Sequence, residues 1–121
     1  MSNKIINKTK EEPVQTNPSG AICSDQTGRG AYHLISTKGL RRLALRYEAG
    51  NIQKGDRNWE KGIPMSVAMN KIARHWSEHL EGDRTEDHLA AIAFWSFALM
   101  HFEENNRHDL DDLPGNKDRV K

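Results

Sequence analysis

Residues 89–102 read LAAIAFWSFALMHF, a run in which only Ser96 and His101 are polar. A helix that is apolar on every side is buried on every side, so this run predicts a buried helix. A domain of three helices cannot surround one of its own members. We therefore expect another copy of the chain to cover part of this helix, which predicts a homo-oligomer.

Two amphipathic helices are expected before this run. The first begins near Ser36 or Thr37, either of which can cap it, and Gly50 stands where the glycine that follows a helix end belongs. Its apolar stripe is Leu40, Leu43, Ala44 and Tyr47. The second has Pro64 in its first turn, with Ser66 as an alternative cap, and ends at Gly82. Its apolar face is Met65, Met69, Ile72, Ala73, Trp76 and Leu80.

The apolar run itself belongs to a third helix, which Thr85 is expected to cap and which continues to about Asn105. The N-terminal segment is polar, lacks apolar periodicity and contains Pro13 and Pro18, which break helices. The sequence thus predicts an all-α fold, a small helical domain of about three main helices with an antiparallel hairpin. The flexible N-terminal arm, the helical domain and the charged C-terminal tail are expected at residues 1–27, 28–105 and 106–121.

The composition excludes several classes of protein. Of 121 residues, 18 are basic and 17 acidic, and this balance argues against nucleic-acid binding, which usually requires a clear basic excess. No apolar run approaches the roughly 18 residues of a membrane span, so we expect no membrane association. The single Cys23 cannot form an internal disulfide and has no zinc-ligand spacing around it. Without an apolar signal segment, we expect a cytoplasmic protein, in the host cytoplasm if the gene is a phage gene.

The hairpin of the second and third helices is expected to bring several titratable side chains together. The connection has only a few residues, so the two helices should pack antiparallel. One end of this hairpin then gathers His75, Glu78, Glu86, Asp87 and His88. Carboxylates beside imidazoles suit a divalent cation and an activated water, for which a carboxylate can act as general base. The candidate metal ligands are Glu78, Glu86 and Asp87.

Both this cluster and the loop before the second helix also allow a structural interpretation. Carboxylates at a helix start are ordinary caps, and a lone histidine on a helix is usually solvated or hydrogen-bonded in the core. In the loop, Trp59 can serve as an anchor by burying its ring while Asn58 adopts a left-handed turn conformation. Alternatively, the same loop can hold a nucleotide, with Trp59 stacked on the base and Arg57 donating to phosphate.

The order of these motifs resembles a known family. Arg57-Asn58-Trp59-Glu60-Lys61-Gly62 is followed by Arg74-His75, by Gly82-Asp83 and by Asp87-His88-Leu89-Ala90-Ala91. This order resembles the dATP/dGTP diphosphohydrolase N-terminal domain of phages and bacteria, a family similar to the all-α nucleoside triphosphate pyrophosphatases. The resemblance covers about residues 28–104.

The resemblance implies self-association and a hydrolase for purine deoxynucleoside triphosphates that uses Mg2+ or Mn2+. Water would attack the α-phosphorus and release pyrophosphate, while the metal neutralises charge in the transition state. Carried over residue by residue, it implies nucleotide binding by Arg57, Asn58, Trp59, Lys61 and Arg74. It implies catalysis by His75, Asp87 and His88.

Two alternatives to an enzyme remain. The related pyrophosphatases carry Glu-Glu-x-x-Glu on one helix and Glu-x-x-Asp on the next, whereas the nearest runs in this chain are His75-x-x-Glu78 and Glu86-Asp87-His88. This departure favours a non-catalytic, oligomeric nucleotide-binding protein, for example a phage protein that sequesters a signalling nucleotide. In the other alternative, the chain is a helical accessory protein whose polar cluster only caps helices.

Overall fold

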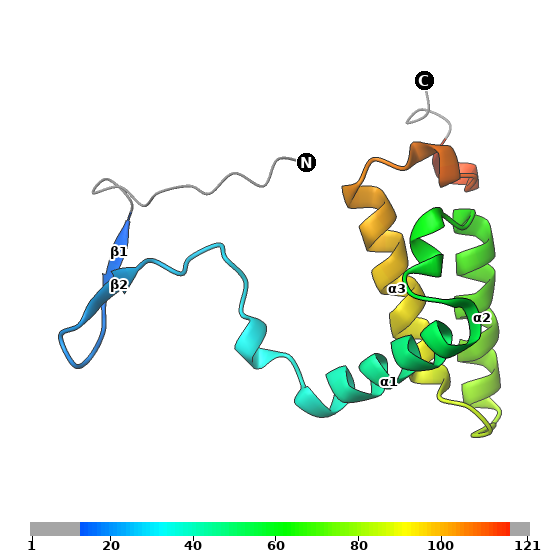
Figure 1. Ribbon diagram of the computed structural model, residues 1–121, viewed down its shortest axis with the longest axis horizontal. Coiled ribbons are helices and arrows are strands. Elements are labelled where there is room, and N and C mark those ends of the chain that lie inside the picture. Colours follow the sequence, from blue (N-terminus) through cyan, green and yellow to red (C-terminus); the bar gives the residue numbers. More distant parts are fainter. Residues whose placement is uncertain (1–12, 117–121) are drawn as a thin grey trace. The chain divides into compact units, whose positions relative to one another are not determined.

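The computed structural model describes residues 13–116, and the chain divides into two compact units between Ile35 and Ser36 (Figure 1). The first unit contains an antiparallel hairpin of β1 (Val14–Thr16) and β2 (Ile22–Ser24), in which Gln15 pairs with Cys23. A short 3-10 helix, Tyr32–Leu34, follows. The sequence did not predict these strands, which are too short to show a periodic pattern. Residues 28–35, expected in the helical domain, belong to this first unit.

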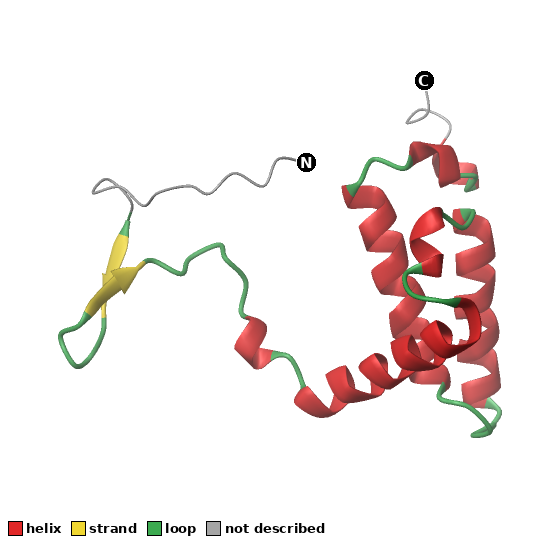
Figure 2. Ribbon diagram, in the orientation of Figure 1, coloured by secondary structure: helices red, strands yellow, loops and turns green. Residues whose placement is uncertain are grey.

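The second unit is helical and contains α1 (Thr37–Lys54), α2 (Met65–Leu80) and α3 (His88–Glu104). The helices α2 and α3 lie side by side and antiparallel, as predicted, and α1 also packs against α3 (Figure 1). Figure 2 separates the strands of the first unit from the helices of the second by colour. No helix among the described residues is long and apolar enough to cross a lipid bilayer.

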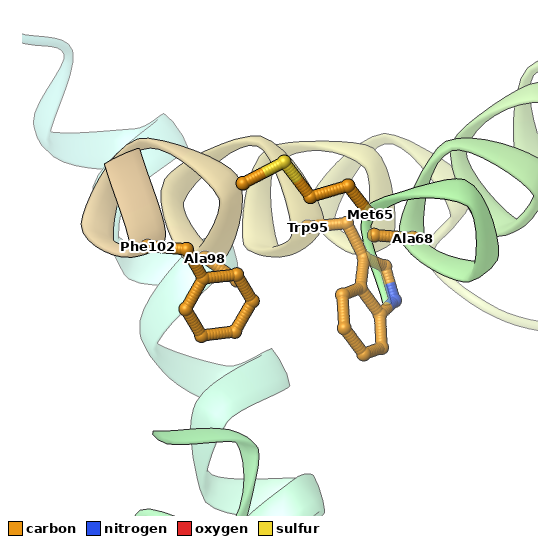
Figure 3. Close-up of a cluster of buried hydrophobic side chains, with 5 residues drawn as sticks. All are labelled: Met65, Ala68, Trp95, Ala98 and Phe102. Atoms are coloured by element: carbon orange, nitrogen blue, oxygen red, sulfur yellow. The ribbon is translucent and has the colours of Figure 1, made fainter. Parts of the chain in front are cut away.

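The core of the helical unit lies along the α2–α3 contact (Figure 3). Phe102 of α3 is fully buried, and Ala68 and Ala98 are equally inaccessible. Because alanine side chains are small, the two helix backbones can approach each other closely at these positions. Met65 and Trp95 complete the cluster. The partly buried side chains packed around it are Trp59, Ile63, Ile72, Phe94, Leu99, Leu110 and Leu113.

The helix termini show where local sequence signals were sufficient and where they were not. Ser36 caps α1 as expected, because its hydroxyl accepts the Gly39 N–H at 3.0 Å. However, α1 continues through Gly50, and it is Gly55, at φ 93°, that follows the helix end. The prediction for Gly50 was therefore wrong, since a glycine inside a helix costs only about 1 kcal/mol and packing can outweigh it.

The α2–α3 turn ends α2 as predicted but starts α3 two residues later than the Thr85 cap implied. Gly82 has φ 93°, and the N–H of Asp83 donates to the Glu78 carbonyl at 3.1 Å, which satisfies the end of α2. The cap of α3 is Asp87, whose carboxylate accepts the Ala90 N–H at 3.0 Å. Thr85 instead donates its N–H and its hydroxyl to the Asp83 carboxylate.

Residues 107–113, which the sequence placed in the charged C-terminal tail, pack onto the helical unit. Leu110 and Leu113 contact the hydrophobic core. Asp112 accepts the Ser66 N–H at 2.8 Å and the Ser66 hydroxyl at 2.6 Å, and so caps the start of α2. Gly62 lies beneath this segment, since a Cβ at Gly62 would stand 2.7 Å from Nη2 of Arg107.

Several large apolar side chains of the helical hairpin are exposed. On α3, Leu89, Phe97 and Met100 are exposed, so this helix is not buried on every side within the chain. On α2, Met69, Trp76 and Leu80 are exposed, although the apolar pattern placed them on the core-facing side. The core-facing stripe of α2 instead contains Met65, Ala68, Ile72 and His75.

Candidate functional site

Two buried histidines face each other at the turn end of the α2–α3 hairpin. His75 of α2 is 2% exposed and His88, the first residue of α3, is 1% exposed. Their Nδ1 atoms lie 2.8 Å apart. Because a neutral imidazole carries one N–H and one lone pair, one of these nitrogens donates and the other accepts. Burial lowers the pKa of His75, which favours the neutral ring.

Asp83 extends this pair from the turn between the helices. Its Oδ2 lies 2.8 Å from Nε2 of His88, so the His88 ring donates its Nε2 proton to a carboxylate. This hydrogen bond, together with those from Thr85, lowers the pKa of Asp83 to about 2. The sequence arguments assigned no role to Asp83, although its place directly after Gly82 in a short turn was a usable signal.

Each candidate metal carboxylate is paired with an arginine. Glu78 accepts from Arg74 at 3.0 Å, within α2. Glu86 accepts from Arg46 at 3.0 Å, and this contact lowers the Glu86 pKa. Asp87 accepts two hydrogen bonds from Arg42 of α1. None of these arginine partners was predicted. The pairs of Glu86 and Asp87 form because α1 packs against the hairpin, and the pair of Glu78 forms because Arg74 lies one helical turn away in α2.

Asp87 is held by Arg42 through two hydrogen bonds of 2.7 and 2.6 Å, from Nε and Nη2. The Arg42 hydrogen bond is the main reason why the pKa of Asp87 falls to about 2. Since the same carboxylate also accepts the Ala90 N–H, Asp87 serves as a helix cap and ion-pair partner. Its roles in metal binding and catalysis stay predictions.

Glu78, Glu86 and Asp87 are not among the described groups of three whose ligand atoms converge. Mg2+ requires near-octahedral oxygen ligands, and the three carboxylates proposed for it are directed toward three different arginines. A different group does converge, because ligand atoms of His75, Glu78 and His88 all lie within 4.8 Å of one another. Glu86 lies at its margin, with Oε1 3.9 Å from Nδ1 of His75.

A pocket of about 360 Å³ lies between α1, the Asn58–Lys61 turn, α2 and α3. Its size falls within the usual range of small-molecule sites. Trp59, Phe94 and Trp95 contribute aromatic surface to its lining, and Arg46, Lys54 and Lys71 contribute positive charge. The Lys71 ammonium lies 5.7 Å from the centroid of the Trp95 ring. Glu86 also lines this pocket, so the pocket adjoins the buried histidines.

The residues predicted to bind nucleotide are divided between this pocket and other surfaces. Asn58 and Trp59 line it. Arg57 lines a more open pocket with Tyr47 and pairs with Glu60 at 2.8 Å. Lys61 is exposed in the turn, and Arg74 pairs with Glu78.

The loop itself agrees with the structural interpretation of Trp59. The Trp59 ring contacts Tyr47, Phe94, His101 and Phe102, with centroids 4.8–6.3 Å apart. The left-handed residue is Arg57, at φ 57°, and not Asn58 as the sequence suggested. A tryptophan anchored in this way still presents part of its surface to the pocket.

Comparison with known proteins gives one match. A family model described as dATP/dGTP diphosphohydrolase, N-terminal, matches residues 20–112. The matched range contains the hairpin, the buried histidines and the pocket, and it ends at the residue that caps α2. No curated protein and no solved structure matches the chain.

Proposed function

The chain belongs to the dATP/dGTP diphosphohydrolase N-terminal family, and from this premise we propose that it binds a purine deoxynucleoside triphosphate and hydrolyses it to a monophosphate and pyrophosphate. The observation that carries the proposal is the pocket between α1, α2 and α3, in which aromatic rings and cations line one cavity beside a polar cluster. A nucleotide presents the same combination, a flat base joined to a chain of anionic phosphates.

The lining suggests how the nucleotide would lie. The base stacks against Trp59 or Phe94, and the phosphates meet Arg46 and Lys71. Aromatic stacking contributes about 1–3 kcal/mol per base in nucleic-acid-binding proteins. An arginine adds a planar fork of donors that matches phosphate oxygens. The phosphate end then lies toward Glu86, next to the histidine pair.

Glu86 is the candidate for orienting the attacking water. Among the described residues that line the pocket it is the acidic one, and Arg46 keeps it ionised by lowering its pKa. A carboxylate in this position can accept a hydrogen bond from water and hold it in line for attack on the α-phosphorus. The reaction would use Mg2+ or Mn2+, as the family resemblance implies, and the ion would neutralise phosphate charge in the transition state.

Nucleotide affinity tests the pocket. We expect dGTP or dATP to bind the full chain in isothermal titration calorimetry. Arg46→Gln and Lys71→Gln should each weaken binding by about ten- to a hundredfold, because a hydrogen bond to a charged group contributes about 1.5–3 kcal/mol. Arg41→Gln is the matched control, since Arg41 is exposed on the same helix and is not among the residues that line this pocket. Equal affinities for all three variants would place the nucleotide elsewhere.

Product analysis tests the reaction. Incubation with dGTP or dATP and Mg2+ or Mn2+ should yield the monophosphate and pyrophosphate, separated by ion-exchange chromatography. Glu86→Gln should lower turnover far more than it lowers affinity, because the amide keeps the size of the side chain and loses its basicity. An inert protein that still binds nucleotide would refute the enzymatic half of the proposal.

A non-catalytic nucleotide-binding protein is the second candidate. The observation that favours it is the pairing of Glu78, Glu86 and Asp87 with arginines, which leaves the site without a converging set of free carboxylates. This candidate predicts an intact nucleotide in the supernatant when the purified protein is denatured. If calorimetry detects no binding of any nucleotide, the remaining possibility is a helical accessory protein.

Self-association is a separate part of the proposal. The exposed Trp76, Met69 and Leu80 on α2 offer an apolar surface that a second copy could cover. Light scattering after size exclusion should then give a mass above that of one chain. Trp76→Glu should shift the equilibrium toward the monomer, and a monomer for the unmodified chain across the micromolar range would contradict the proposal.

A further inference from the structure

We propose that His75, Glu78 and His88 form a binding site for one divalent transition-metal ion, of the Zn2+ or Co2+ class, that links α2 to α3. The site differs from the carboxylate set that the sequence suggested, and its binding does not depend on a nucleotide.

The geometry of the three ligands supports the site. His75 and Glu78 are three residues apart on α2 and therefore project from the same side of the helix. His88 comes from the first position of α3, on the other side of the hairpin. Their ligand atoms lie within 4.8 Å of one another. Two nitrogens on a tetrahedral ion with bonds of about 2.1 Å lie about 3.4 Å apart, so the Nδ1 atoms, now 2.8 Å apart, need to move only about 0.6 Å.

The surroundings of the histidines also resemble those of metal ligands. The carboxylate of Asp83 accepts the Nε2 proton of His88 at 2.8 Å, which leaves Nδ1 of His88 as the coordinating atom. A carboxylate on the second ring nitrogen is the usual partner of a metal-bound histidine, because it fixes the tautomer and raises the basicity of the ligand. Two Nδ1 atoms that face each other in a buried site require a proton or a cation between them.

Access and charge are compatible with an ion. The Glu78 side chain is 35% exposed, which opens the cluster to solvent. Its carboxylate has two oxygens, so it can accept from Arg74 and bind the ion at once. Two imidazoles and one carboxylate suit first-row transition metals, whereas Mg2+ prefers oxygen ligands. Three protein ligands leave a further position open on a tetrahedral ion.

Metal titration tests the site directly. The full chain, purified without a polyhistidine tag and freed of metals by a chelator, is titrated with Co2+ and followed by visible absorption. We expect one equivalent of Co2+ to give the absorption bands of a four-coordinate ion, Zn2+ to displace it, and millimolar Mg2+ to leave the bands unchanged. Absence of stoichiometric Co2+ and Zn2+ binding would overturn the proposal.

Variants locate the ion without disturbing the core. Glu78→Gln should weaken Co2+ binding by at least about tenfold, and Asp83→Asn by about 10–100-fold, the usual loss when the partner of a metal-bound histidine is removed. Glu81→Gln, an exposed change one turn further along, is the matched control and should bind as the unmodified chain does. The side chains of Glu78 and Asp83 are partly exposed, so both variants should fold. Circular dichroism checks that they do. Binding that neither variant weakens would place the ion on other residues and refute the site.

The outcome is distinguishable from that of the nucleotide experiments. The metal titration contains no nucleotide, and the calorimetry variants Arg46→Gln and Lys71→Gln do not change a metal ligand. Failure of the metal site therefore leaves the proposed nucleotide pocket standing, and failure of nucleotide binding leaves the metal site standing.

Discussion

Substitution of Gly62 by alanine should destabilise the helical unit strongly, because two features of the structure oppose a side chain at this position. Gly62 has φ 110° and ψ 133°, a backbone conformation that is almost confined to glycine. An added Cβ would also stand 2.7 Å from Nη2 of Arg107 and 3.1 and 3.2 Å from the two Cδ atoms of Leu110. Leu110 packs against the core, so it cannot move away freely.

The magnitude follows from three contributions. The backbone strain costs about 1–3 kcal/mol. The steric overlap with Leu110 costs about 1–3 kcal/mol, as in other overpacked sites. Alanine has less conformational freedom than glycine in the unfolded chain, and this difference offsets about 0.4–1 kcal/mol of the destabilisation. The free energy of unfolding should therefore fall by about 1–5 kcal/mol, which lowers Tm by about 4–20 °C for a chain of this size.

Gly50→Ala is the matched control, with an expected effect of opposite sign. Gly50 lies inside α1, and a Cβ there would meet nothing within 4 Å. Since alanine favours a helix over glycine by about 0.5–1 kcal/mol, this variant should raise Tm by about 2–4 °C. Both variants are measured by thermal unfolding, followed by far-ultraviolet circular dichroism, and by urea unfolding.

Two results would refute the reasoning. If Gly62→Ala leaves the free energy of unfolding within about 0.5 kcal/mol of the unmodified chain, the segment after α3 does not pack over Gly62. If Gly50→Ala destabilises the protein, Gly50 has the left-handed conformation of a helix end, and α1 stops where the sequence alone suggested.

Substitutions at three further positions test other parts of the helical unit. Phe102→Ala removes a fully buried ring and should lower the free energy of unfolding by about 3–5 kcal/mol in urea; a loss below 1 kcal/mol would contradict the assigned core. Ser36→Ala removes the cap of α1 and should cost about 0.5–2 kcal/mol, whereas Ser36→Asp should keep most of the stability. The Ser66 hydroxyl and N–H lower the pKa of Asp112 below its usual 3.8. The ionised carboxylate therefore stabilises the fold at pH values above 3.8, and this stabilisation is lost as the pH falls through the pKa of the folded state. Asp112→Asn should therefore lower Tm at pH 7 and make Tm decrease less as the pH is lowered. A Tm profile between pH 7 and pH 2 identical to that of the unmodified chain would exclude the cap.

The helical hairpin could be predicted because its signals are local. The apolar spacing in α2, the run in α3 and the glycine at the end of α2 all act within a few residues of one another. Gly50 and Gly55 show the limit of such signals. Both are glycines near the end of an amphipathic pattern, and only the conformation of Gly55 distinguishes them. The choice depends on packing between α1 and α3, which a pattern within α1 does not contain.

The candidate site, like the fold, could be predicted only in part. Antiparallel pairing of α2 and α3 was enough to bring His75, Glu78 and His88 to one end of the hairpin. The arginines that pair with the carboxylates were not predictable, since Arg42 and Arg46 reach Asp87 and Glu86 across 40 or more residues of sequence. The charge composition limits how many ion pairs can form. The packing of α1 against α3 determines which arginine pairs with which carboxylate.

The cap that Asp112 places on α2 has a consequence for the order in which the protein becomes structured during synthesis. Ser66 leaves the ribosome 46 residues before its capping partner. Until Asp112 and the neighbouring Leu110 emerge, the first turn of α2 has neither its carboxylate nor the apolar contact that holds it. Domains generally fold as units once their parts are available. The helix that carries His75 and Glu78 therefore becomes stable only after Asp112 has emerged, when the hairpin, its cap and its core can form in one step.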